Sequence, residues 1–192
     1  MTAPSFPVTG DADKDALLVS DPFALVLGMM LDQQIIMEKA FAGPYDLRER
    51  LGGRLDPSVI ASSDPAVIEG AFRTKPALHR YPAAMAKRAI ALATMIVEDY
   101  SGDTASIWTG AVDGADLFAR VRALPGFGDG KARIFIALLA KRFGVRPDGW
   151  ADIAGDLADD TPRSVADIDS PEALERVRAW KKEQKAKAKA DA

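Results

Sequence analysis

The stretch that most constrains the fold of this chain is Leu-Pro-Gly-Phe-Gly-Asp-Gly-Lys-Ala at residues 124–132. Apolar residues with helical spacing precede it, namely Leu117, Phe118 and Val121. They resume after it at Ala132, Phe135, Ile136, Leu139 and Phe143. Because Pro125 disfavours the helical conformation at the residue before it, the first helix must end near Leu124. The sequence therefore predicts two helices joined by a tight, glycine-rich turn.

The composition of this turn favours an anion-binding site. Gly126, Gly128 and Gly130 permit positive φ and remove side chains that would keep a ligand at a distance. The second helix begins there, so its unpaired N–H groups and positive dipole end face an anion such as a phosphate. Lys131 adds a full positive charge. The structural alternative is a plain connection between two helices.

Composition restricts the class of protein. A chain of 192 residues with 48% hydrophobic residues predicts one domain or two small interleaved lobes. The absence of cysteine excludes disulfides, thiolate-bound zinc and cysteine-ligated iron–sulfur clusters, and a single histidine argues against a His-rich metal site or a Ser-His-Asp triad. The sequence shows no signal peptide and no apolar stretch of membrane-spanning length, which predicts a cytoplasmic protein without membrane association.

The formal net charge of −3 argues against bulk attraction to nucleic acid, but the charges are unevenly distributed. Two stretches contain basic residues and no acidic ones: Arg73, Lys75, Arg80, Lys87 and Arg88, then Lys131, Arg133, Lys141, Arg142 and Arg146. Acidic residues gather later, at Asp152, Asp156, Asp159, Asp160, Asp167 and Asp169. Since screening makes phosphate contacts local, one basic face can bind DNA on an acidic protein. The alternative is that these charges only solvate helix surfaces.

Helix-start signals recur along the chain, and sustained apolar–polar alternation is absent, so we expect an all-α fold. An aspartate or serine precedes proline at Asp21-Pro22, Asp56-Pro57, Asp64-Pro65 and Ser170-Pro171. The expected helices cover residues 22–37, 44–51, 57–61, 65–72 and 82–99, the two hairpin helices, and a last helix after Ser170, with a loop at 101–113. The first is apolar nearly all round and is expected to be buried. The basic tail at 181–192 is expected to be solvated and partly disordered.

The Leu-Pro-Gly-x-Gly form with Lys-Ala following resembles the helix–hairpin–helix (HhH-GPD) superfamily of DNA glycosylases, over roughly residues 20–150. Leu31-Asp32-Gln33-Gln34 resembles the helix end where relatives place a glutamine that fills the gap left by a flipped base. Residues 81–93, with Met85-Ala86-Lys87-Arg88, are similar to the helix that precedes the hairpin. The chain looks like the short bacterial members that have no iron–sulfur cluster.

The resemblance implies a two-lobed helical fold with a cleft between the lobes. The helical lobe would span 26–132, with the hairpin motif at 115–143, and residues 1–25 with 133–180 would form the second lobe. It also implies a monomer that binds double-stranded DNA in the nucleoid. The hairpin would grip a DNA phosphate through backbone amides, beside a Na⁺ or K⁺ ion held by the carbonyls of Leu124 and Gly126.

The resemblance assigns the essential carboxylate to Asp148. Cleaving an N-glycosidic bond builds positive charge on the sugar, which a nearby carboxylate stabilises. In relatives the aspartate follows a fixed hairpin position by 18 residues, and counting from Gly130 leads to Asp148. Asp148 would stabilise the sugar cation or orient a water; the structural alternative is a turn or helix N-cap residue, and Asp152 is the next candidate.

One departure from the pattern lies at Gly130. Strand-cutting relatives carry a lysine at that position, which forms a Schiff base with the sugar. Lys131 comes one residue later, about 100° further around the helix. We therefore expect a monofunctional glycosylase without lyase activity.

The expected DNA-binding residues are Gly126, Phe127, Gly128, Asp129, Gly130, Lys131, Gln33 and Gln34. Either glutamine can enter the duplex or, alternatively, cap the buried helix. Relatives specific for adenine opposite damaged guanine carry a glutamate where Met29 stands, so that specificity is not expected. Four aromatic residues have a size suited to stacking on an extruded base or to core packing: Trp108, Tyr45, Tyr81 and Trp150. We expect His79 on the surface or against a phosphate.

The expected function is base-excision DNA repair by an N-glycosylase without a cofactor. A second hypothesis is a non-catalytic helix–hairpin–helix protein that binds DNA or senses damage. A third is a helical interaction protein whose acidic region 148–172 binds a protein partner.

Overall fold

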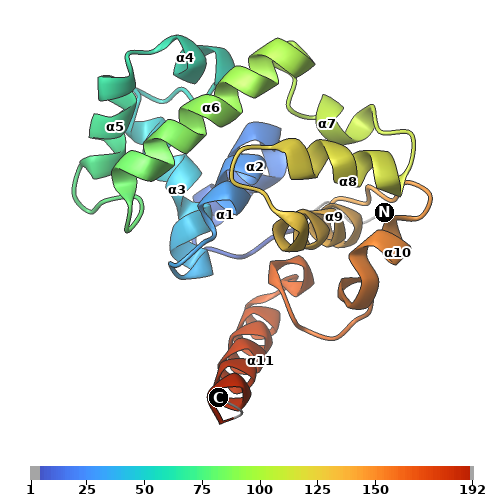
Figure 1. The fold of residues 1–192 in the computed structure, drawn as a ribbon. Coiled ribbons are helices and arrows are strands. Elements are labelled where there is room, and N and C mark those ends of the chain that lie inside the picture. The colour runs from blue at the N-terminus through green and yellow to red at the C-terminus, as the bar shows by residue number, and fades with distance from the viewer. Residues whose placement is uncertain (1–4, 191–192) are drawn as a thin grey trace.

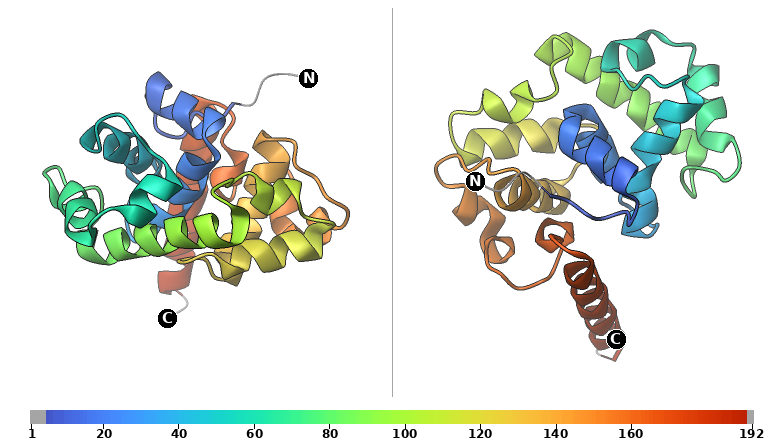
Figure 2. Two further views of the ribbon diagram at one scale, coloured as in Figure 1. Left: turned by 90° about the horizontal axis from the view of Figure 1, so that it is seen from above. Right: turned by 180° about the vertical axis from the view of Figure 1, so that it is seen from behind.

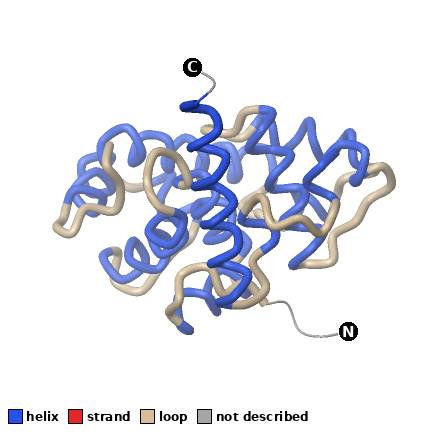
Figure 3. The backbone as a smooth tube through the Cα atoms, turned by 90° about the horizontal axis from the view of Figure 1, so that it is seen from below, coloured by secondary structure: helices blue, strands red, loops and turns tan. Residues whose placement is uncertain are grey.

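The structure is a computed structural model that describes residues 5–190, and within that range it contains helices and loops but no strand (Figures 1 and 3). The helices are α1 (Ala12–Ser20), α2 (Pro22–Leu31), α3 (Met37–Arg50), α4 (Pro57–Ser62), α5 (Pro65–Arg73), α6 (Pro82–Tyr100), α7 (Ser106–Thr109), α8 (Gly114–Ala123), α9 (Asp129–Arg142), α10 (Trp150–Ala154) and α11 (Pro171–Ala190), with 3₁₀ turns η1 (Gly155–Ala158) and η2 (Val165–Asp167). The all-α prediction is confirmed.

The predicted helix starts lie where the sequence placed them. The carboxylates of Asp21, Asp56 and Asp64 each accept backbone N–H groups at the start of α2, α4 and α5, and proline is the first residue of each helix. The Ser170 hydroxyl accepts the N–H of Ala173 at the start of α11. These caps satisfy N–H groups that have no partner within the helix.

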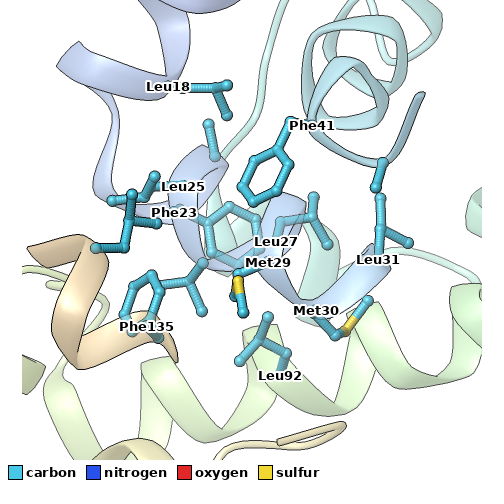
Figure 4. Close-up of a cluster of buried hydrophobic side chains, with 14 of the residues drawn as sticks. Leu18, Phe23, Leu25, Leu27, Met29, Met30, Leu31, Phe41, Leu92 and Phe135 are labelled. Carbon is cyan, nitrogen blue, oxygen red and sulfur yellow. The ribbon is translucent and has the colours of Figure 1, made fainter. Parts of the chain in front are cut away.

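Helix α2 lies at the centre of the molecule, and every residue from Phe23 to Leu31 is buried (Figures 1 and 4). Side chains from other helices surround it, including Leu18 of α1, Phe41 of α3, Leu92 of α6 and Phe135 of α9 (Figure 4). Helix α3 packs closely against α2 because Gly28 has no side chain. A Cβ atom at this position would lie only 2.8 Å from the Phe41 ring. The prediction of a helix buried on most sides is confirmed.

The remaining helices surround α2. Helices α4 and α5 pack on α6, whereas α8 and α9 run side by side in opposite directions and contact α10 (Figures 1 and 2). The N-terminal segment contacts both α3 and the end of α9. The Phe6 ring lies 5.2 Å from the Phe41 ring and 6.4 Å from the Phe143 ring, measured between centroids. One hydrophobic cluster runs from Phe6 to Val177. The finer division into two lobes, one at 26–132 and the other made of 1–25 with 133–180, stays a prediction.

Several predicted boundaries are wrong. Helix α2 ends at Leu31 rather than near Met37, because the N–H of Gln33 turns back to the Leu31 carbonyl at 2.7 Å and Gln34 takes a left-handed conformation with φ of 56°. Helix α3 begins at Met37, well before residue 44, and includes Pro44. The expected loop at 101–113 contains α7, and α10 was not predicted.

The basic tail also differs from expectation, because α11 continues through Ala190; residues 191–192 of the tail lie outside the described range. Arg178 of α11 forms an ion pair with Glu38, and Lys181 Nζ lies 3.1 Å from Met37 Sδ, so α11 contacts the start of α3. Of the helices that the structure describes, none is both long and apolar enough to span a membrane.

Candidate nucleic-acid interface

The turn between α8 and α9 is a type II β-turn. The Phe127 N–H donates to the Leu124 carbonyl at 3.0 Å, and Gly126 has φ of 88° at the position where this turn requires a positive value. Leu124 and Phe127 are buried, and the Phe127 ring packs edge-on against Phe135 at 5.8 Å. The turn is therefore anchored to the core by the residues on either side of Gly126.

The three glycines of the turn have different roles. Only Gly126 has a positive φ, whereas the expectation included Gly128 and Gly130. A Cβ atom at Gly126 would lie 2.6 Å from Arg88 Cδ and 3.0 Å from Met30 Cγ, while one at Gly128 or Gly130 would meet nothing within 4 Å. Gly126 permits close packing, and the other two leave open space in front of α9.

The N-terminus of α9 has no capping side chain. Gly128 is the N-cap residue, whereas aspartates cap α2, α4 and α5. Gly128, Asp129 and Gly130 are all exposed. The Asp129 carboxylate, in the first turn of α9, pairs with Arg122 at 2.5 Å, so its negative charge is partly neutralised. The first N–H groups of α9 are thus available to an anion from solvent.

Lys131 turns back from this helix end toward α2. Its Nζ donates to the Met30 carbonyl at 3.0 Å and lies 5.8 Å from the centre of the Phe127 ring. Burial lowers the pKa of Lys131 to about 8, against the opposing effect of the Asp32 carboxylate. The amine is therefore a half-buried group that links α9 to the end of α2.

The two glutamines predicted to act together are in different environments. The Gln33 amide is engaged on both sides: Nε2 donates to the Met30 carbonyl at 2.9 Å, and Oε1 accepts from Arg88 at 3.0 Å. Gln34 is exposed. Gln33 thus fastens the loop after α2 to α6, and Gln34 is the glutamine available to a ligand.

His79 is buried at 1% exposure, so its predicted place on the surface or against a phosphate is wrong. Its Nδ1 accepts the N–H of Tyr81 at 3.0 Å, which leaves the proton on Nε2, and Nε2 lies 2.9 Å from the Gln33 carbonyl. Burial is the main cause that lowers the pKa of His79. The neutral ring therefore donates a hydrogen bond to the backbone of Gln33 and stabilises the loop after α2.

The structure does not place Asp148 beside the hairpin. Asp148 is exposed in the turn before α10, and its backbone carbonyl accepts the N–H of Gly114, at the start of α8, at 2.7 Å. The ten residues of α8 separate that end from the hairpin, which is about 15 Å at 1.5 Å per residue (Figure 1). Its side chain does not cap α10, and Asp152, also exposed, is in the first turn of that helix.

A further carboxylate at this end of the molecule is that of Asp32, which directly follows α2 and precedes Gln33. It lines an open hollow of about 410 Å³ together with Ile36, Met37 and Lys181. Burial raises the pKa of Asp32, while Lys181 and Lys131 act in the opposite direction. Ile36 is 68% exposed beside it. The hollow thus combines two carboxylates, Asp32 and Glu38, with an apolar wall and two cations of α11, Arg178 and Lys181.

The four candidate stacking aromatics are spread over the molecule. Trp108 is half-buried and packs on Phe135 at 6.2 Å, and Tyr45 is half-buried next to Arg48. Trp150 is half-buried near Arg146. Tyr81 is 44% exposed and lies directly after the loop that carries His79, so it is the aromatic nearest in sequence to the hairpin contacts.

The two basic stretches only partly form one face. Arg88 of the first meets Lys131 of the second near Met30 and Gly126. Lys141 and Arg142, by contrast, lie at the far end of α9 and pair with Asp167 and Asp169. The single basic face expected from the sequence is therefore divided between the two ends of α9.

Across residues 5–190, no group of three or more His, Asp or Glu side chains is placed to hold a metal ion. The Leu124 carbonyl already accepts the Phe127 N–H and keeps a second lone pair. A monovalent cation at Leu124 and Gly126 stays a prediction.

Comparison of the chain with models of protein families, with curated proteins and with solved structures gives no match. Sequence reasoning brought together Gln33, Gln34 and the hairpin, and it missed the linking roles of Arg88 and His79. The acid-free stretch around Arg88 was a signal for the first; no local signal marked His79.

Proposed function

We propose that this chain binds duplex DNA through the turn at 124–128 and excises a damaged or mismatched base, as a helix–hairpin–helix glycosylase. The observation that carries the proposal is the bare start of α9, where Gly128 and Gly130 leave open space in front of uncapped N–H groups. Such an end binds a phosphate through N–H donors and the helix dipole. The Leu-Pro-Gly-x-Gly sequence and its setting favour a DNA phosphate over other anions.

Gln34 supplies the group that enters the duplex in this proposal. It is exposed and holds a left-handed backbone with φ of 56°, which costs a residue with a side chain roughly 1–2 kcal/mol. Such strain persists where the surroundings impose it, and it gathers at functional sites. The loop that imposes it is fastened by Gln33 to Arg88 and His79. Gln34 would occupy the gap when a base leaves the stack.

The resemblance assigns the carboxylate of the reaction to Asp148, and the geometry makes Asp32 a second candidate. Asp148 lies about 15 Å from the hairpin, which equals four to five nucleotides at 3.4 Å per step along one strand. Asp32 directly follows α2, and the charges of Lys181 and Lys131 act on its carboxylate. A carboxylate must lie next to the sugar to stabilise its developing charge. The two aspartates therefore have to be tested in parallel.

We propose that the reaction leaves the DNA strand intact. The Lys131 amine donates to the Met30 carbonyl and is half-buried, so it is not presented at the open face of α9. Gly130, which occupies the position of the Schiff-base lysine in strand-cutting relatives, has no side chain. Hydrolysis by an activated water then accounts for base loss without a covalent enzyme intermediate.

Base release from a panel of duplexes tests the proposal directly. Uracil, alkylated purines, oxidised guanine and mismatches would be incubated with the full chain, and strand breaks scored with and without alkali. We expect breaks only after alkali, lost in Asp148→Asn or in Asp32→Asn, whichever carries the reaction. Breaks without alkali would contradict the monofunctional reaction. So would an enzyme–DNA adduct formed by borohydride reduction of a Schiff base, if both the breaks and the adduct are lost in Lys131→Met.

A non-catalytic DNA-binding protein is the second candidate, and the separation of Asp148 from the hairpin favours it. It predicts duplex binding with a steep salt dependence and no base release from any substrate in the panel. Absence of salt-sensitive duplex binding would instead support the helical interaction protein and remove both DNA functions.

A further inference from the structure

A basic pocket lies at the end of α9 opposite the hairpin, where α9 meets η2 and the loop before α11. It has a volume of about 390 Å³, within the range of small-molecule sites. Its cations are Lys141, Arg142, Arg146 and Arg176, which come from α9, the loop after it and α11. Along α9, eleven residues from Lys131 to Arg142 put this pocket about 16 Å from the hairpin end.

Two of the acidic residues at this pocket are already paired. Asp167 accepts Lys141 at 2.6 Å and also caps η2 through the backbone N–H groups of Arg163 and Ser164 at 2.9 Å. Asp169 lies 3.5 Å from a terminal nitrogen of Arg142. These contacts neutralise the charges of Lys141 and, in part, Arg142. They do not involve the guanidinium groups of Arg146 and Arg176.

The remaining donors outnumber the remaining acceptor. Arg146 and Arg176 form no salt bridge with any residue in the range 5–190, and Asp160 is the one carboxylate of the pocket in the same condition. Arg146 is held in place by a bond from Nε to the Ala140 carbonyl at 3.0 Å. Two guanidinium groups therefore face one carboxylate, which leaves the pocket a net excess of positive charge.

Arg142 contributes a donor with no acceptor among the described residues. Its Nε atom is buried and has no hydrogen-bond partner, and the side chain as a whole is 18% exposed. A buried charged donor without a partner is costly, and in native structures an ordered water, an ion or a ligand usually satisfies it. Because Arg142 lines the pocket, an anion bound there would be attracted to the same guanidinium group whose Nε has no acceptor.

We infer that this pocket binds a phosphate group, held by Arg142, Arg146 and Arg176. Guanidinium groups bind phosphate oxygens in a planar, bidentate manner, which three arginines from separate segments provide on one ligand. The volume exceeds that of a single phosphate, so a phosphorylated small molecule fits as well as a phosphate of the DNA backbone. The inference does not depend on the proposed glycosylase activity, because the hairpin lies at the opposite end of α9.

Calorimetric titration of the full chain with inorganic phosphate tests this inference, with chloride at equal ionic strength as the reference. We expect one saturable site, weakened at least tenfold in Arg146→Gln/Arg176→Gln. Arg54→Gln removes an exposed charge in the loop at 51–56 and is expected to leave binding unchanged. Circular dichroism of the variants establishes that they fold.

Duplex binding by the same variants separates the two sources of phosphate. If the pocket holds a backbone phosphate, the double variant loses duplex affinity and the salt slope decreases by about 0.9. If it holds a free phosphorylated molecule, duplex binding is unchanged while phosphate binding is lost. No saturable phosphate site together with unchanged duplex binding, or an equal loss in Arg54→Gln, would overturn the inference.

Discussion

The Nε2 atom of His79 lies 2.9 Å from the backbone carbonyl oxygen of Gln33, and this contact ties the loop after α2 to the start of α6. The Nδ1 atom accepts the Tyr81 N–H, so the ring must be neutral for both bonds to form. The conformation of the loop that carries Gln33 and Gln34 therefore depends on the protonation state of one buried histidine.

This relationship predicts that acid destabilises the fold through His79. Burial lowers its pKa in the folded state below the ordinary 6.5, so the unfolded chain takes up a proton first as the pH falls. The stabilising contribution is complete above pH 6.5 and is lost as the pH falls through the folded pKa. NMR of the single histidine would measure that pKa, and urea unfolding would measure stability at pH 7.5 and 5.0.

His79→Gln is the matched control for that measurement, because it keeps a hydrogen-bond donor and removes the titration. The stability difference between wild type and the variant should shrink from pH 7.5 to 5.0. A difference that is constant over this range would show that the ring does not titrate as the burial requires.

Lys131→Met is expected to stabilise the protein at neutral pH. The folded pKa of Lys131 is about 8 and the ordinary value is 10.5, so between these values only the unfolded chain keeps the proton. Wild-type stability therefore rises with pH in this window, and the advantage of methionine is largest below pH 8 and smaller at pH 10. Met30 O keeps the Gln33 amide as a donor in the variant. Denaturant unfolding at pH 7 and 10 gives the comparison; an advantage that grows at pH 10 would contradict it.

Gly128→Asp separates folding from DNA binding at the hairpin. The N-cap backbone of Gly128, with φ of −118° and ψ of −179°, suits an aspartate that accepts the first N–H groups of α9. Stability should be equal or a few tenths of a kcal/mol higher. Duplex affinity should fall by about tenfold or more, because a carboxylate occupies the phosphate position.

Gly70→Asp on α5 is the control for Gly128→Asp, since Gly70 is exposed and a Cβ atom there meets nothing within 4 Å. It adds the same charge away from the hairpin and should leave duplex affinity nearly unchanged in fluorescence anisotropy. Equal losses in both variants would indicate a general charge effect rather than a phosphate site at α9.

Gly114→Ala should be strongly destabilising, although position 114 begins a helix. A Cβ atom there would lie 2.7 Å from Trp150 N and 2.8 Å from Gly149 C, and neither backbone atom can move independently. Overpacking of this kind costs about 1–3 kcal/mol. Because Gly114 also fixes the turn that contains Asp148, its thermal unfolding should be compared with that of Gly70→Ala, where α5 should gain stability from alanine.

Gln34→Ala is expected to affect base extrusion more than duplex binding. Its side chain makes no hydrogen bond to another described residue, so folding stability should change by less than about 0.5 kcal/mol. In a duplex with 2-aminopurine at the target, the fluorescence increase on binding should be lost, while anisotropy changes little. An unchanged fluorescence increase would remove Gln34 from the proposed function.

The helical class, the capped helix starts and the hairpin could be predicted from the sequence, because each depends on residues a few positions apart. An aspartate two residues before an N–H group, or a proline after Leu124, acts through local backbone geometry alone. The burial of α2 also followed from its composition, since a helix that is apolar on every side has no face for water.

Tertiary structure alone decided which of these local elements meet. His79 is a buried donor because the start of α6 lies against the loop after α2. Lys131 is half-buried because its amine donates to the Met30 carbonyl, 101 positions away in the chain. Asp148 followed the hairpin by the expected spacing, yet the antiparallel course of α8 and α9 carried it to the opposite end. Spacing along a chain fixes a distance only within one helix; across a turn, the packing of the helices sets it.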